Sequence, residues 1–137
     1  MDVNIIPTTA THQSSLRVMK RKNGPYFVGK FAKAPIKSWI QEFQMKIRQY
    51  KPDTAWDCPV HAHIEFKFPW NKSAPKKLIN NDGWKTTRPD LDNMEKMILD
   101  SLTSEGFLVD DSIICSKTTM KMHSPSPKIL IILRKIT

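Results

Sequence analysis

Strict alternation of apolar and polar residues over positions 59–68 is the feature that most constrains the fold. The apolar positions are Val60, Ala62, Ile64, Phe66 and Phe68. Because successive side chains of a strand point to opposite faces, this pattern predicts a half-buried strand whose apolar face must be covered by another layer. The opposite face carries His61, His63 and Glu65. We interpret it as a polar face rather than a zinc site, because the nearby Cys58 has the wrong strand parity and no further histidine or cysteine lies close.

The remaining periodicities predict two helices and three more strands. Apolar residues recur at helical spacing over residues 36–50 and again over 91–102. Residues 2–6, 112–122 and 128–136 are interpreted as strands, and the last, apolar on both faces, is expected to be central. Together these elements predict an α+β fold in which residues 1–137 form a single domain. We expect a two-layer α/β sandwich with a mixed sheet and two main helices.

The chain is basic overall but concentrates its acids in one segment. It has 22 Lys and Arg against 13 Asp and Glu, a net charge of +9. Seven of the acids and a single base lie within residues 90–111, so that window has a net charge of −6 and the remainder +15. A basic body is typical of proteins that bind a phosphate backbone, and we expect nucleic acid as the partner. The acidic window would repel that backbone unless a bound divalent cation neutralised it.

Membrane insertion and secretion are not expected. No apolar run approaches the roughly 20 residues of a spanning helix, and the first residues lack a basic and then apolar signal. Cys58 and Cys115 lie far apart in sequence, which favours reduced thiols, although a single disulfide between them stays open. We therefore predict a cytoplasmic protein with no membrane partner.

The acidic window contains the candidate chemistry. Asp90 stands at the expected N-cap of the 91–102 helix, and Asp110 and Asp111 form a turn before the next strand. One helix face then carries a polar stripe of Asp92, Asn93, Lys96 and Asp100. If the chain folds back, Asp90, Asp92 and Asp111 can converge on one point. From the residues alone, purely structural interpretations stay open. Asp90 can be a helix cap, Asp92 can form an i,i+4 ion pair with Lys96, and Asp110 and Asp111 can form a turn.

Three convergent carboxylates would bind a hard divalent cation. Mg²⁺ takes oxygen ligands, polarises a phosphoryl oxygen and lowers the pKa of a nucleophilic water. Lys96, one turn after Asp92, is placed to neutralise charge on the phosphate or on the leaving oxygen. This combination predicts metal-dependent phosphodiester hydrolysis. The alternative is a non-catalytic basic nucleic-acid-binding protein whose acids only cap and solvate a helix.

The motif Asp90-Leu-Asp-Asn-x-x-Lys96, followed by Phe107-x-x-Asp-Asp111, resembles the core of the RusA-like Holliday-junction resolvases, and the similarity covers roughly residues 59–117. The resemblance implies a dimeric Mg²⁺-dependent endodeoxyribonuclease, with Mn²⁺ as an alternative cofactor, that cuts four-way DNA junctions symmetrically. It implies that the metal ligands are Asp90, Asp92 and Asp111, and that Lys96 is the catalytic lysine. Asn93 and Asp110 would have supporting roles. Branched double-stranded DNA and a second copy of the chain would be the partners, in a bacterial or phage-infected cell.

Two basic segments are candidates for DNA contact. One is the loop of residues 70–88 inserted before the catalytic helix, whose basic residues are Lys72, Lys76, Lys77, Lys85 and Arg88. The other is the run Lys20, Arg21 and Lys22. The loop is equally consistent with a mobile solvated segment, and a run such as 20–22 is usually a solvated turn. Trp70 and Trp84 bracket the loop and are candidates for stacking on splayed bases.

Overall fold

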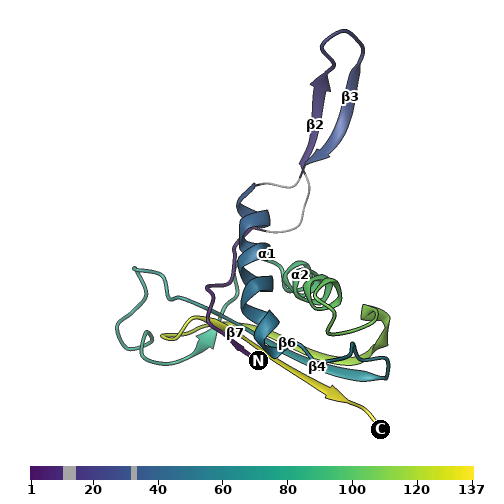
Figure 1. Ribbon diagram of the computed structural model, residues 1–137. Coiled ribbons are helices and arrows are strands. Elements are labelled where there is room, and N and C mark those ends of the chain that lie inside the picture. Colours follow the sequence, from purple (N-terminus) through teal and green to yellow (C-terminus); the bar gives the residue numbers. More distant parts are fainter. Residues whose placement is uncertain (11–14, 32–33) are drawn as a thin grey trace.

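Two helices are interspersed among seven strands in the described part of the chain, which agrees with the predicted α+β class (Figure 1). The computed structural model describes residues 1–10, 15–31 and 34–137. The elements, in chain order, are β1 (Asp2–Val3), β2 (Ser15–Lys20), β3 (Tyr26–Phe31), α1 (Ala34–Ile47), the 3₁₀ turn η1 (Arg48–Tyr50), β4 (Val60–Phe68), β5 (Gly83–Trp84), α2 (Leu91–Ser104), the 3₁₀ turn η2 (Asp111–Ile113), β6 (Ile114–His123) and β7 (Lys128–Lys135).

The main sheet has five strands in the order β1-β7-β4-β6-β5. β4 pairs in parallel with β6 and antiparallel with β7, so the predicted mixed sheet is confirmed. The prediction that the last strand is central was wrong. β4 occupies the centre, and β7 has on its other side only the two-residue β1. Ile132 of β7 is 43% exposed because it points to the face opposite the buried Ile129 and Ile131, away from the helices.

The apolar face of β4 forms the middle of the core. Every second residue from Val60 to Phe68 is buried, whereas the intervening residues are half-buried, as the alternation predicts. Phe43 of α1 and Ile98 of α2 are both fully buried in the same cluster. In Figure 1 the two helices lie on the same side of the sheet. The opposite side of β4 carries polar contacts instead, such as the 2.9 Å contact between His63 Nε2 and Glu65 Oε1.

A separate hairpin precedes α1. β2 and β3 pair antiparallel from Ser15 opposite Phe31 to Lys20 opposite Tyr26, and in Figure 1 they stand away from the rest of the molecule. The sequence predicted a turn here but no hairpin. The exposed residues at its tip include the basic run 20–22, and the Lys20 ammonium lies 5.7 Å from the centre of the Tyr26 ring. Among the described helices, none has the length and apolar character needed to span a membrane.

Candidate functional site

The N-terminus of α2 presents the first predicted carboxylates. Asp90 has the extended backbone of an N-cap residue, and its carbonyl oxygen accepts a hydrogen bond from the Met94 amide at 3.3 Å. The predicted position is therefore confirmed. Its carboxylate, however, makes no capping hydrogen bond. No residue in the described part of the chain forms a hydrogen bond or ion pair with the carboxylates of Asp90 or Asp92, and both side chains are exposed. The capping interpretation thus leaves the Asp90 side chain unexplained.

A lysine on β6 holds the segment that leads into α2. The Lys121 ammonium donates to the carbonyl oxygen of Thr87 at 2.9 Å and to that of Pro89 at 2.7 Å. Pro89 itself is buried. These bonds fix the backbone immediately before Asp90. Sequence reasoning did not single out Lys121, although strand alternation over 112–122 could have shown that it shares a face with Lys117 and Thr119.

Glu95 joins α2 to β6. Its carboxylate, 12% exposed, accepts hydrogen bonds from the Lys117 ammonium and, at 2.6 Å, from the Thr119 hydroxyl. This acid of the acidic window therefore has a structural role. Its bonds hold the face of α2 adjacent to the polar stripe against the sheet.

Lys96 lies on the exposed side of α2. Its ammonium lies 3.4 Å from an Asp100 carboxylate oxygen, and its side chain is 66% exposed. The i,i+4 pair with Asp92 that was considered as an alternative is not formed. Asn93 is half-buried on the same helix. An exposed ion pair of this kind contributes only a few tenths of a kcal/mol, so the ammonium can be redirected to a phosphate at little cost.

Asp110 and Asp111 begin η2. The Ser112 amide donates to the Asp110 carboxylate at 2.8 Å, and hydrogen bonds from the Ser112 hydroxyl and amide lower the pKa of Asp110. Asp110 thus caps the turn. Asp111 is exposed and lines a shallow hollow of about 320 Å³ together with Leu99 and Lys117. Leu99 comes seven residues after Asp92, or about 10 Å of helix rise, so Asp111 lies toward the far half of α2.

The predicted three-carboxylate cluster is not formed within one chain. Across residues 1–10, 15–31 and 34–137, no group of three or more His, Cys, Asp and Glu side chains could hold a metal ion. The donor type nevertheless suits Mg²⁺, which proteins commonly bind through one or two carboxylates while substrate phosphates and water complete the coordination. Asp90 and Asp92 fit that description, and the role of Asp111 stays a prediction.

The basic candidates divide into exposed and buried residues. Lys72, Lys76, Lys77 and Arg88 are exposed. Lys85 is only 9% exposed. Its ammonium lies 5.0 Å from the Phe68 ring centre and donates to the Thr87 hydroxyl at 2.7 Å, and burial lowers its pKa. A lysine turned inward in this way does not suit the predicted phosphate contact.

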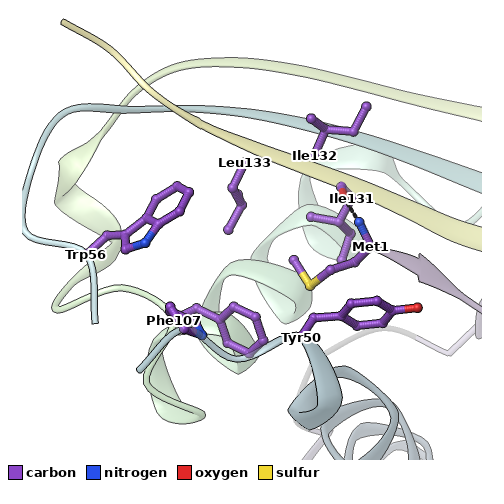
Figure 2. A pocket seen from close by; sticks show the side chains of 8 residues that line it. Met1, Tyr50, Trp56, Phe107, Ile131, Ile132 and Leu133 are labelled. Carbon is purple, nitrogen blue, oxygen red and sulfur yellow. Dashed lines mark hydrogen bonds between the residues drawn. The ribbon is translucent and has the colours of Figure 1, made fainter. Parts of the chain in front are cut away.

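A different hollow, of about 280 Å³, is lined mainly by apolar side chains (Figure 2). The residues that line it are Met1, Tyr50, Pro52, Trp56, Phe107, Ile131, Ile132 and Leu133. None of the predicted catalytic or DNA-contacting residues belongs to it, so the candidate site is the surface around α2 rather than this hollow.

Comparison with known proteins agrees with the motif. The family model described as Endodeoxyribonuclease RusA matches residues 7–134, almost the whole chain. A comparison with curated proteins yields no match. The match extends well beyond the 59–117 region over which the motif resemblance was recognised.

Proposed function

Because the chain belongs to the RusA endodeoxyribonuclease family, we propose that it is a Mg²⁺-dependent enzyme that resolves four-way DNA junctions by paired phosphodiester hydrolysis. Family membership makes it a nuclease, which disfavours the alternative of a non-catalytic DNA-binding protein. The observation that best supports the proposed site is the pair Asp90 and Asp92. These two acids, separated by one residue at the start of α2, have carboxylates that no described residue engages, in a chain of net charge +9.

In this proposal Asp90 and Asp92 bind the metal, and Asp111, which lies toward the far half of α2, would have to move toward them to contribute a further carboxylate. When bound, Mg²⁺ would supply charge that polarises the scissile phosphate. The chain itself orients the site: Lys121 holds the backbone of Thr87 and Pro89, so the Asp90 main chain starts from a fixed position. Mn²⁺ is the alternative cation because it accepts the same oxygen ligands.

Lys96 exchanges its Asp100 partner for a phosphate or leaving oxygen in the proposed complex. Its exposed ion pair offers little resistance to that exchange. Asn93 and Asp110 have supporting roles: Asn93 belongs to the polar stripe, and Asp110 caps the turn that contains Asp111 by accepting the Ser112 amide. The proposed enzyme works as a homodimer, since a junction with two equivalent strands suits a two-fold protein with two sites.

The test is cleavage of a synthetic four-way junction with and without Mg²⁺. We expect paired nicks on opposing strands from the wild type with Mg²⁺, and binding without cleavage from Asp92→Asn. Asp53→Asn removes an exposed carboxylate outside α2 and is the matched control, which should cut normally. Wild-type cleavage by Asp92→Asn would refute the site. Sedimentation of the wild type as a monomer on the junction would refute the dimer.

A further inference from the structure

Trp84 and Lys85 reverse the usual preference for burial. The Trp84 side chain is 73% exposed, whereas its neighbour Lys85 is 9% exposed and lies over Phe68. A buried charged group is an informative exception in a folded protein, and here it lies next to the most exposed of the large apolar side chains in the described part of the chain. Trp84 ends β5 and Lys85 follows it directly, so a shift of the pairing by one residue would exchange their sides, burying the indole and exposing the ammonium. In the observed register the indole stays exposed although its burial would stabilise the fold. This indicates that the exposed indole has a functional role.

The strand that carries Trp84 has a rigid support. A Cβ on Gly83 would lie 2.8 Å from the Trp70 ring, so only glycine allows this approach. Trp70 in turn stacks on His123 with ring centres 4.7 Å apart and donates its indole N–H to the Asn81 carbonyl at 2.9 Å. Trp70, the other stacking candidate, is therefore already engaged. Trp84 is left facing an open hollow of about 310 Å³.

The surroundings of Trp84 suit a nucleic acid. The hollow is lined by Asp82, Gly83, Trp84 and Met122. The Asp82 carboxylate is already paired with the Lys67 ammonium at 3.1 Å, which reduces its repulsion of a phosphate. The preceding loop adds exposed lysines, including Lys72, Lys76 and Lys77.

The distance to the candidate carboxylates is bounded by the chain. Trp84 precedes Asp90 by six residues, so their Cα atoms lie no more than about 22 Å apart. The intervening segment is held at Thr87 and Pro89 by Lys121. With bases stacked about 3.4 Å apart, one DNA strand of six or seven nucleotides spans that limit. A single junction strand can therefore contact Trp84 and the start of α2 together.

We propose that Trp84 is a stacking platform for a DNA base left unstacked at the branch point, and that it sets the preference for branched over linear DNA. This inference rests on the proposed function. In a continuous duplex, neighbouring bases cover each other, so the indole has no base face to meet. At a branch point a base face is available, and stacking on an aromatic ring tolerates any base.

The experiment compares full-length wild type, Trp84→Leu and Trp84→Phe on a four-way junction and on a linear duplex of the same sequence, without divalent metal. We expect Trp84→Leu to weaken junction binding about tenfold while duplex binding is unchanged, and Trp84→Phe to keep most of the affinity. With 2-aminopurine at the branch point, wild type should quench the probe more than Trp84→Leu does. Met45→Ala, which removes another exposed apolar side chain, is the control and should behave as wild type.

Equal junction affinity for wild type and Trp84→Leu would overturn the proposal, as would an equal loss on junction and duplex. Circular dichroism checks that each variant is folded, which is expected because the side chain is exposed. Failure of the proposed function is a separate result: the wild type would then produce no paired nicks with Mg²⁺. An enzyme that nicks normally while Trp84→Leu keeps full selectivity refutes only the stacking role.

Discussion

Glu95 allows a direct test of the difference between structural and catalytic acids on α2. Its carboxylate accepts the Thr119 hydroxyl at 2.6 Å and the Lys117 ammonium, and its side chain is 12% exposed. A hydrogen bond to a charged, largely buried acceptor contributes about 1.5–3 kcal/mol. Lys117 is 55% exposed, so its ion pair adds only about 0.2–1 kcal/mol. Glu95→Ala should therefore lower the free energy of unfolding by about 2–3 kcal/mol.

For a chain of this length that loss corresponds to a Tm decrease of about 6–12 °C. Urea unfolding of Glu95→Ala, Thr119→Val and the double variant measures the coupling, which we expect to be about 1–2 kcal/mol. Glu42→Ala, which removes an exposed i,i+4 partner of Lys46, is the control and should cost no more than about 0.5 kcal/mol. Folded Glu95→Ala should still cut junctions. A coupling energy below about 0.3 kcal/mol, or a stable but inactive Glu95→Ala, would refute this assignment.

Two further predictions concern charge. Lys85→Met should leave junction affinity and its salt dependence unchanged because Lys85 is buried. Lys76→Met should instead flatten the slope of log affinity against log salt by about 0.9. Fluorescence anisotropy at several salt concentrations measures both effects. Hydrogen bonding from Arg48 lowers the pKa of Glu105 in the folded state below its ordinary 4.5. The ion pair therefore stabilises the fold above pH 4.5, and this stabilisation is lost as the pH falls through the lowered pKa of the folded state. Urea midpoints of Glu105→Gln and wild type should thus differ at neutral pH and converge in acid; a constant difference would contradict the linkage.

The strong periodicities made most elements predictable. Alternation over 59–68 and helical spacing over 36–50 and 91–102 match β4, α1 and α2 closely. Sheet order was not predictable in the same way. The strand at 128–136 is apolar on both faces, but its position depends on which partners its edges meet, and the short β1 leaves it near the margin.

The candidate site shows a similar division. The N-cap position of Asp90 follows from local backbone preference, and the structure confirms it. Lys96 had acids at both i−4 and i+4, and the preferred orientation of such pairs favours Asp92. The structure pairs it with Asp100 instead, because the exposed side chain is free to take either direction. The inward turn of Lys85 was also hidden, since the two-residue β5 is too short to show a period.

The central place of β4 in the sheet has a consequence for synthesis of the protein. β4 ends at Phe68, but its partners begin only at Ile114 and Lys128. At roughly 5–20 residues per second, the ribosome needs about 3–12 s to reach the start of the second partner after finishing β4. Until synthesis reaches Ile114, which takes most of that interval, a nine-residue segment with five apolar side chains has neither neighbour available. The yield of soluble enzyme therefore depends on what shields this segment on the nascent chain, and a holdase chaperone acting there should raise it.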